Sequence, residues 1–527
     1  MSNNSNLFAG FDLSTQQLKF TAINEISKVV FEELVNFDKE LPSYGTKNGV
    51  ISNENVVICP TLMWVESIDL LLNKLSEKKF PFHQIKAMSG AAQQHGSVYW
   101  SENSLGILEN LNPTESLVSQ FINAFSIPDS PTWQDSSTTE QCKNLEKLIG
   151  GKEILVNLSG SIAYERFTGN QITKFSQTNP LAYSKTKRIS LISSFLASIF
   201  LDGDGEKLKL KLGEPEPNGL KILGNVSNYF VKKYGFDKDC RIIPFTGDNP
   251  ATLISMNLTP GDILISLGTS DTILLYTNKP SPTIESHTLC HPTNPSAYMS
   301  MICYKNGSLT REYIRDKYTT TIRNDSNDPS LLSSAWTLFN QLLKTSKPNK
   351  RKMGFYFLVQ EIIPFAKGIY RFEDSQLIDE FQDDPKLDNV RCIIESQFIS
   401  MRIRIEKLIN DFENLVNKVV VVGGASKNHE ILQVLSDVFG KEIWKQKHHH
   451  NCNDNNDVNA ASMGAAMKAK MAFNFENDFE DEKLEINSFV SVAKPRIEYT
   501  DIYKDMFNVY KELENIVINN RISRIQE

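Results

Sequence analysis

Asp248 and Asn249 place a carboxylate and an amide side by side in the stretch FTGDNPATLISM, residues 245–256. The pattern predicts a strand that ends near Phe245 and a short apolar helix with Asn249 as its N-cap and Pro250 as its first residue. That arrangement leaves Asp248 at a strand end, close to the positive end of a helix dipole. Catalytic and ligand-binding groups of α/β proteins are often found there. The stretch therefore predicts a functional carboxylate, beside the plainer explanation of a capped helix start.

A second carboxylate, Asp12, ends a strand-like run in GFDLSTQQLKF and is followed by Ser14 and Thr15. Backbone N–H groups of such a turn can approach a phosphate, and a carboxylate beside them can hold Mg²⁺, usually through water. An Asx-turn that caps a hairpin would use the same residues. The sequence by itself leaves both alternatives open.

A glycine turn in SLGTSDT offers Gly268, Thr269 and Ser270. Glycine lets a phosphate approach the backbone, and the two hydroxyls add hydrogen-bond donors. An ordinary hairpin turn has the same composition. Taken alone, this turn favours the hairpin.

A second glycine turn, in VVGGASKN, places Gly423 and Gly424 between a strand and a helix. It matches neither GxGxxG nor a Walker loop. The glycine pair permits close packing of a flat ligand such as adenine, with Asn428 available as a polar contact. The alternative is a tight strand–helix turn with Ser426 as the N-cap.

Polar side chains follow a further strand-like run in QQHG, and others lie in YERFTGNQ. Gln94 and His95 lie next to a glycine at the expected strand end, and Arg166 lies in the second stretch. Such side chains suit the recognition of sugar hydroxyls. The alternative is a core histidine whose hydrogen bonds are satisfied and a surface arginine.

The surrounding elements predict two related α/β domains. Apolar runs over residues 7–36 predict a three-stranded antiparallel meander, residues 56–79 a helix, and QIKAMSGAAQQHG a strand. Residues 261–278 repeat the strand–turn–strand pattern of residues 7–24, and residues 418–440 form a strand, a Gly-Gly turn and an amphipathic helix. This weak repeat predicts two domains that meet near residues 250–260, with a ligand between them.

Three segments fall outside the repeat. Residues 202–219 are charged and rich in glycine and proline, which predicts a loop. Residues 445–459 are a polar tract whose His448, His449, His450 and Cys452 could bind a metal. A disordered surface insert is the favoured interpretation, since adjacent histidines do not converge on one ion. Near the end, DIYKDMFNVYKELENIVINN predicts a closing helix.

Composition predicts a soluble two-domain protein of the cytoplasm. The chain has 527 residues, 40% hydrophobic and 23% charged, and its net charge is −7. This charge gives no reason to expect nucleic acid or an acidic membrane as a partner. The seven cysteines are scattered without a CxxC pair, which indicates reduced thiols. We expect no signal peptide and no membrane span, because the chain contains neither pattern.

Taken together and in this order, the motifs resemble those of the FGGY carbohydrate kinases, and within that family the xylulose kinases of eukaryotes. The resemblance covers residues 7 to about 470. It is carried by stretches that include FDLSTQQLKF, SGAAQQHGSVYW, WQDSSTTEQC, AYERFTGNQITKF, FTGDNPATL, GDILISLGTSDT, YKNGSLTRE and GGASKNHEILQVLSDVF.

The resemblance implies a fold of two ribonuclease H-like domains of the actin-like ATPase type, with a cleft between them. It places an N-terminal sugar-binding domain at residues 1–250, a C-terminal nucleotide-binding domain at 251–475, and a tail at 476–527. The implied reaction is the ATP-dependent phosphorylation of D-xylulose to D-xylulose 5-phosphate, which feeds the pentose phosphate pathway. The implied ligands are ATP, Mg²⁺ and a ketose, with no nucleic acid or membrane partner. We expect a monomer or a weak homodimer.

The resemblance also implies residue roles. Asp248 matches the catalytic base, and Asp12 matches the acidic residue near the phosphates and Mg²⁺, which it would hold through water. The sugar contacts are His95, Arg166, Asp248 and Asn249. The nucleotide contacts are Gly268, Thr269, Ser270, Trp336, Gly423, Gly424, Ala425 and Asn428.

The chain departs from the family at residues 202–219, where a charged loop replaces a longer family segment that normally packs near the sugar side. This departure favours an alternative, a non-catalytic or impaired paralogue that binds sugar or nucleotide as a sensor. The intact Asp12 and Asp248 favour the active kinase. An actin-like or chaperone-like ATPase is a further alternative, which the predicted sugar site argues against.

Overall fold

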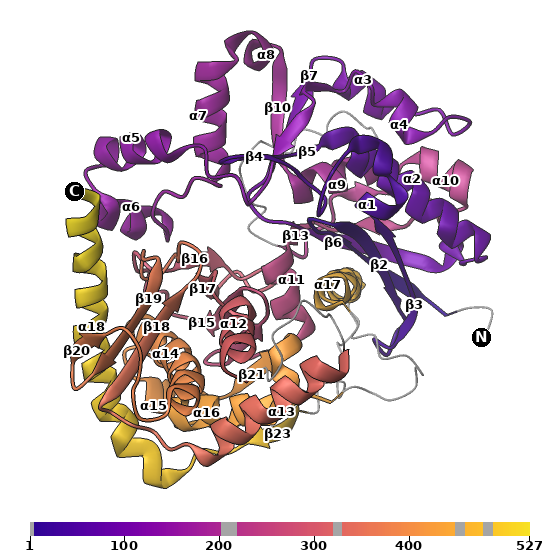
Figure 1. Ribbon diagram of the computed structural model, residues 1–527. Coiled ribbons are helices and arrows are strands. Elements are labelled where there is room, and N and C mark those ends of the chain that lie inside the picture. Colours follow the sequence, from indigo (N-terminus) through magenta and orange to yellow (C-terminus); the bar gives the residue numbers. More distant parts are fainter. Residues whose placement is uncertain (1–4, 202–218, 320–328, 448–458, 478–488, 527) are drawn as a thin grey trace.

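Two mixed sheets, one in each half of the chain, form the frame of the molecule (Figure 1). The computed structural model describes residues 5–201, 219–319, 329–447, 459–477 and 489–526. Residues 202–218 and 448–458 lie outside these segments, so the predicted loop and the predicted His/Cys tract stay predictions there. No helix in the described segments is both long enough and apolar enough to cross a membrane.

The first sheet begins with the antiparallel meander that the sequence predicts, since β1 pairs with β2 and β2 with β3. β6 then pairs parallel with β1, and β12 and β13 pair parallel with β6. The strands run in the order β11-β12-β6-β1-β2-β3, with β13 beside β6: Gly224–Asn225, Arg241–Ile242, Ile85–Ala92, Leu7–Leu13, Gln17–Ile23, Val29–Asn36 and Thr246–Gly247.

The second sheet repeats this pairing, which confirms the predicted repeat. β14 pairs antiparallel with β15 and parallel with β21, as β1 does with β2 and β6. The order is β16-β17-β15-β14-β21-β22-β23: His287–Cys290, Tyr298–Tyr304, Asp271–Thr277, Ile263–Leu267, Val419–Val422, Ile443–Gln446 and Phe489–Ala493. Residues 445 and 446 of the predicted polar tract therefore belong to strand β22.

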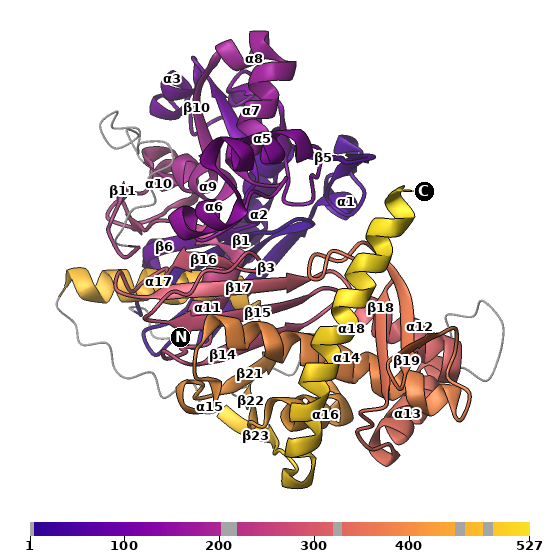
Figure 2. The same ribbon diagram turned by 90° about the vertical axis from the view of Figure 1, so that its left-hand side faces the viewer.

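Helices cover both faces of each sheet (Figures 1 and 2). The outer face of the first sheet packs on α2, α9 and α10: Thr61–Glu77, Ile192–Phe200 and Asn228–Tyr234. The outer side of the second sheet carries α12, α13, α14, α16 and α18: Ser308–Thr319, Pro329–Thr345, Pro385–Leu408, His429–Phe439 and Thr500–Gln526. The last of these is the predicted closing helix.

Two helices, α11 and α17, lie between the sheets: Asp248–Ser255 and Ala460–Glu476. α17 packs on the inner face of the first sheet, and α11 contributes Leu253 to a cluster on the inner face of the second. Small residues bring these layers close, since a Cβ on Gly464 would lie 1.8 Å from the backbone oxygen of Ala251. A Cβ on Gly10 would lie 2.0 Å from the backbone oxygen of Ser462. Neither position tolerates a side chain without moving α17.

A smaller layer projects from the first domain. It contains helices α5, α6, α7 and α8: Thr139–Ile149, Lys152–Ser159, Thr168–Thr178 and Pro180–Ser184. Beside them lies the small sheet β10-β7-β8: Thr186–Leu191, Ser97–Ser101 and Phe125–Ile127.

Short elements complete each half. In the first half they are α1, α3, α4, β4, β5 and β9: Phe37–Glu40, Ser104–Glu109, Leu117–Gln120, Ile51–Asn53, Val56–Pro60 and Asp129–Pro131. In the second half they are β18, β19, β20 and α15: Lys352–Phe357, Gly368–Glu373, Gln376–Ile378 and Phe412–Leu415.

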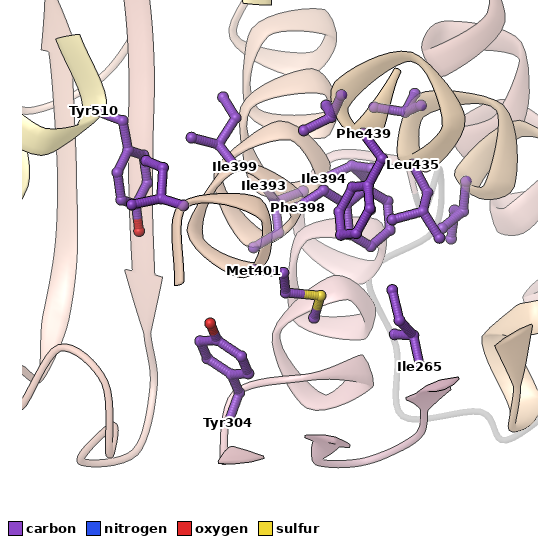
Figure 3. Packing of buried hydrophobic residues seen from close by; sticks show 14 of the residues in the cluster. Ile265, Tyr304, Ile393, Ile394, Phe398, Ile399, Met401, Leu435, Phe439 and Tyr510 are labelled. Carbon is purple, nitrogen blue, oxygen red and sulfur yellow. The ribbon is translucent and has the colours of Figure 1, made fainter. Parts of the chain in front are cut away.

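The largest core lies under the second sheet (Figure 3). Helix α14 supplies Ile394 and Phe398, α16 supplies Leu435 and Phe439, and β14 supplies Ile265. All five side chains are buried, and each fully buried large apolar side chain contributes about 1.5–3 kcal/mol to stability. This core holds the end of β14 in place, from which the turn at Gly268 extends.

One element prediction was wrong at its start. Residues 56–60 form strand β5, and helix α2 begins at Thr61 rather than at residue 56. The physical reason is local, because Val56, Val57 and Ile58 are β-branched and Pro60 lacks an N–H. The apolar periodicity of the helix itself is confirmed from Thr61 onward.

Candidate active site between the two domains

Asp248 is the first residue of α11, directly after the short strand β13. Gly247, rather than Asn249, is the N-cap, so the predicted helix start was wrong by two residues. Pro250 fits inside the first turn because its missing N–H would be unpaired there in any case. Oδ1 of Asp248 accepts hydrogen bonds from the backbone N–H (2.8 Å) and side-chain amide (3.2 Å) of Asn249. Both bonds fix the carboxylate at the helix N-terminus.

Asp12 lies near the carboxyl end of β1, two residues after Gly10 and on the same face, which α17 covers. Its side chain is buried, and Nζ of Lys19 lies 3.8 Å from its Oδ2. Its other oxygen, Oδ1, is buried without a hydrogen-bond partner among the described residues. A buried carboxylate oxygen left unpaired is costly unless a ligand, an ion or water completes it.

The two carboxylates lie at the same edge of the first sheet. β1 and β13 flank β6 on opposite sides, and both Asp12 and Thr246 pair with Ala91. Burial raises the pKa of Asp12 to about 6, with Lys19 opposing the shift. Burial also raises the pKa of Asp248 to about 7, and the negative charge of Asp12 adds to the shift. The structure therefore brings together two carboxylates whose charges interact, as enzyme sites often do.

His95 follows β6 at this same edge with a backbone φ of +71°. Such a conformation is uncommon for a residue with a side chain, and residues that adopt it occur in turns and at functional sites. The hydroxyl of Thr168 donates to the backbone oxygen of His95 at 2.7 Å, which helps hold it. Gln94 is fixed beside Asp248, because its Oε1 accepts from the side-chain amide of Asn249 at 3.0 Å.

Arg166 reaches this edge from the smaller layer, in the turn that precedes α7. Its guanidinium lies 4.7 Å from the centre of the Tyr164 ring. One of its N–H groups donates to Nε2 of His287 at 2.8 Å. His287 belongs to β16 of the second domain, so the arginine connects the two halves of the molecule.

The predicted phosphate turn, Gly268 to Ser270, joins β14 to β15. The first residue of β15, Asp271, directly follows this turn and forms a buried ion pair with Arg311, with an Nη1–Oδ2 distance of 2.8 Å. The backbone N–H of Gly268 donates to Asp271 at 3.1 Å. Gly268 is partly exposed, and Thr269 and Ser270 are exposed, so the two residues that carry hydroxyls are open to a ligand.

The second glycine turn lies beside the first, because β14 and β21 are parallel neighbours and Ser266 pairs with Val422. Gly423 has φ of +88°, and a Cβ there would lie 2.6 Å from the backbone oxygen of Leu267. Gly424 faces open space, since a Cβ added there would meet no atom within 4 Å. The fold therefore requires Gly423, whereas Gly424 leaves room for a ligand.

Asn428 is the N-cap of α16, since its side chain accepts from the N–H groups of residues 430 and 431. Ser426 lies instead in the 3-10 turn Gly424–Lys427, so the alternative with Ser426 as the cap was wrong. The side-chain amide of Asn428 donates to Asn340 of α13 at 2.7 Å. Trp336 lies one helical turn earlier on α13, on the same side as Asn340.

The two groups of predicted residues are thus held on different domains. The charges of Arg166 and Asp248 both act on the thiol of Cys303 in β17, a strand of the second sheet. Burial is the main cause of the raised pKa of that thiol. The predicted residues at the edge of the first sheet are Asp12, His95, Arg166, Asp248 and Asn249. Those on the second domain are Gly268, Thr269, Ser270, Gly423, Gly424, Ala425, Asn428 and Trp336.

Three residues of this region were missed from the sequence. His287 contacts Arg166, and the indole N–H of Trp133 donates to the Thr15 hydroxyl at 2.9 Å. Gln93 is buried, and neither polar atom of its side chain has a partner within the described chain. Trp133 and Gln93 lie in stretches that carried the resemblance. Nothing in the local pattern around His287 could have indicated its role.

Sequence similarity to known proteins shows the family to which the chain belongs. The C-terminal domain of the FGGY family of carbohydrate kinases matches residues 263–473. A xylulose kinase of Mus musculus is 43% identical over 469 residues, which is 82% of this chain and 82% of that protein. The chain belongs to the FGGY family of carbohydrate kinases. A xylulose kinase of Saccharomyces cerevisiae is 39% identical over 82% of this chain and 83% of its own length.

Solved structures of related kinases share the fold. A ligand-bound xylulose kinase from Lactobacillus acidophilus superposes with a TM-score of 0.74 over 97% of this chain and 98% of that chain, at 15% identity. A Plasmodium falciparum glycerol kinase with ADP gives a TM-score of 0.68 over 97% and 98%, at 14% identity. The predicted two-domain actin-like fold is confirmed, and the chain is a carbohydrate kinase, a phosphotransferase.

Proposed function

We propose that this kinase transfers the γ-phosphoryl group of ATP to D-xylulose and forms D-xylulose 5-phosphate. The observation that carries the proposal is the pair Asp12 and Asp248, held at one sheet edge beside polar side chains from both domains. The similarity to xylulose kinases over four fifths of the chain supports the choice of sugar. No observation in the described chain favours the non-catalytic sensor.

Asp248 is the proposed base. Its pKa of about 7 matches the pH at which a cytoplasmic enzyme works, so its carboxylate can accept a proton from the terminal hydroxyl of the sugar. That oxygen then attacks the γ-phosphorus of ATP, and ADP leaves. Phosphoryl transfer depends more on positioning and charge neutralisation than on a strong base, so this carboxylate is basic enough.

Asn249, His95 and Arg166 are the proposed sugar contacts. The Asn249 amide is fixed by Gln94 and Asp248, so it can orient a hydroxyl next to the base. Burial, with the nearby positive charge of Arg166, holds the pKa of His95 well below its usual range. A neutral imidazole can both donate to and accept from a hydroxyl, which suits an uncharged sugar.

Asp12 is the proposed residue for Mg²⁺, held through water. The fit rests on its unpaired buried oxygen and on the preference of Mg²⁺ for carboxylate and water oxygens. Mg²⁺, when bound, neutralises charge on the phosphates. The turns at residues 268–270 and 423–425, with Asn428 and Trp336, are the proposed contacts to ATP.

The proposal also assigns one ligand to each domain. Residues 1–250 would bind the sugar, residues 251–475 the nucleotide, and residues 476–527 would form a tail that closes the second domain. The separation of the two groups of site residues between the sheets supports this division.

The test is a coupled assay of ADP release by the purified full chain with ATP, Mg²⁺ and a set of ketoses. We expect D-xylulose to give the highest kcat/KM. Binding of D-xylulose without turnover would favour the sensor instead. Faster turnover of another ketose would change the proposed substrate, but the chain would still be a carbohydrate kinase. We also propose that the enzyme works in the cytoplasm as a monomer or weak homodimer, and sedimentation at micromolar concentration tests the oligomeric state.

A further inference from the structure

His287 reaches from the second domain into the proposed sugar site of the first. It begins β16, an edge strand of the second sheet. Its ring lies 4.6 Å from the ring of Tyr164, 5.5 Å from that of Phe167 and 6.3 Å from that of His95, measured between ring centres. All three partners belong to the first domain. The imidazole is buried, with 4% of the residue exposed.

Both nitrogens of His287 have partners in the first domain. Nδ1 lies 2.7 Å from the hydroxyl of Ser161, and Nε2 lies 2.8 Å from Nη2 of Arg166. An arginine only donates hydrogen bonds, so Nε2 must accept, and the proton of the neutral ring is on Nδ1. Nδ1–H then donates to Ser161, whose own hydroxyl donates to the backbone oxygen of Ile162 at 3.1 Å. The chain of bonds fixes one tautomer and one ring orientation.

The neutral state of His287 is required by its surroundings. Burial lowers its pKa to about 3, and the positive charge of Arg166 adds to the shift. Within the described residues, no carboxylate lies within ion-pair distance of Arg166. The guanidinium is thus held by a neutral acceptor and by the face of Tyr164, while its charge and its other N–H groups remain available to a ligand.

The backbone joins the domains at the same place. The N–H of Thr288 donates to the backbone oxygen of Gly160 at 2.9 Å. Gly160 has φ of +81°, and a Cβ there would lie 2.3 Å from the Thr288 oxygen. This close contact sets where β16 approaches the segment that carries Ser161 and Arg166.

We propose that His287 is a positioning residue through which the second domain fixes the orientation of Arg166 toward the sugar. The inference rests on the proposed function, because it takes Arg166 as a sugar contact. It adds that the sugar site is complete only when β16 lies against the first domain. Sugar affinity therefore depends on a side chain that need not touch the sugar.

The experiment compares four variants of the full chain by steady-state kinetics and by calorimetric titration with D-xylulose. His287→Leu removes both hydrogen bonds. His287→Gln keeps an acceptor near the place of Nε2, whereas His287→Asn is too short to reach Arg166. His291→Leu is the matched control, since His291 lies in the same segment and stacks on Tyr276 at 4.3 Å without contact to Arg166.

We expect His287→Leu and His287→Asn to raise KM and Kd for D-xylulose by about tenfold or more, which is the loss typical of a hydrogen bond to a charged group. KM for ATP should change by less than about twofold. His287→Gln should recover most of the sugar affinity, and His291→Leu should leave it unchanged. Equal losses in the Leu, Asn and Gln variants would overturn the proposal, and so would a His287→Leu loss no larger than that of the control.

A double variant separates this inference from the proposed function. In an Arg166→Met background, His287→Leu should add less than about twofold to KM, because its target is already gone. A full further loss there would show that His287 acts independently of Arg166. If Arg166→Met itself leaves KM unchanged, Arg166 is not a sugar contact, and both proposals fail at that residue. A normal Arg166→Met loss with an unchanged His287→Leu overturns the inference alone.

Discussion

Replacing Asp248 by Asn should abolish catalysis and at the same time stabilise the folded protein. The amide is nearly the same size as the carboxylate, and its oxygen can still accept both hydrogen bonds from Asn249. It cannot accept a proton from the sugar hydroxyl. We expect the rate of D-xylulose phosphorylation to fall at least ~10²-fold, with nucleotide binding largely intact.

The stabilisation follows from the raised pKa. The pKa of Asp248 is about 7 in the folded protein, against an ordinary value of 3.8 for an exposed aspartate. Between these values the folded state binds a proton that the unfolded state releases, so the stability of the wild type falls as pH rises. A pKa difference of about 3 corresponds to about 4 kcal/mol at pH above 7. Since Asp248 is only partly buried, and water and polar groups relax around its charge, we expect a smaller gain of about 1–3 kcal/mol in the variant.

The assay is thermal unfolding of both proteins at pH 5 and pH 8, where each kcal/mol changes Tm by about 2–4 °C for a domain of this size. The variant should melt higher at pH 8 and show a smaller advantage at pH 5, where the wild-type carboxylate is protonated. The acid limb of kcat/KM for the wild type should fall as pH drops through about 7. Asp239→Asn, at an exposed position of the same domain, is the control and should change neither.

The two parts of this prediction, the loss of activity and the gain in stability, can fail separately. Activity of Asp248→Asn within a few-fold of the wild type would remove Asp248 as the base. A variant that melts lower than the wild type at pH 8, or whose advantage grows as pH falls, would show that the carboxylate is not destabilised by burial. Loss of activity with unchanged stability would agree with Asp248 as the base, but would show that its charge does not destabilise the folded protein.

The nucleotide turn and the ion pair beneath the phosphate turn give further predictions. Gly424→Val should weaken ATP binding far more than D-xylulose binding in calorimetric titrations, because its Cβ position is open and the fold tolerates it; equal weakening would show that the turn is not a nucleotide contact. Gly423→Ala should instead lower Tm, since its φ is +88° and its Cβ position is blocked, and an unchanged Tm would contradict the backbone argument. Arg311→Met should cost about 3–5 kcal/mol in the free energy of unfolding by leaving Asp271 buried and unpaired. Arg351→Met, at an exposed ion pair, should leave Tm almost unchanged, and equal losses in the two arginine variants would reject the role of burial.

Local sequence patterns were enough to predict many of the elements and the residue types at their ends. The strands around Asp12 and Gly268 could be predicted because alternating or continuous apolar residues bounded by turn residues depend on neighbours along the chain. The order of several weak motifs then indicated the family. Local errors remained where two patterns competed, as at residues 56–60, where β-branched residues extended a strand into the predicted helix.

Which side chains meet could not be predicted from the sequence, because it depends on how distant elements pack. Asp12 and Asp248 interact because β1 and β13 lie on either side of β6, which no local pattern encodes. Their pKa values are raised by desolvation in the fold and, for Asp248, also by the charge of Asp12, so the shifts too are properties of the assembled fold. The contact of His287 with Arg166 depends on how an edge strand of one domain packs against the other. Such contacts depend on the packing of elements that are far apart in the sequence. The residues next to each partner along the chain therefore do not indicate the contact.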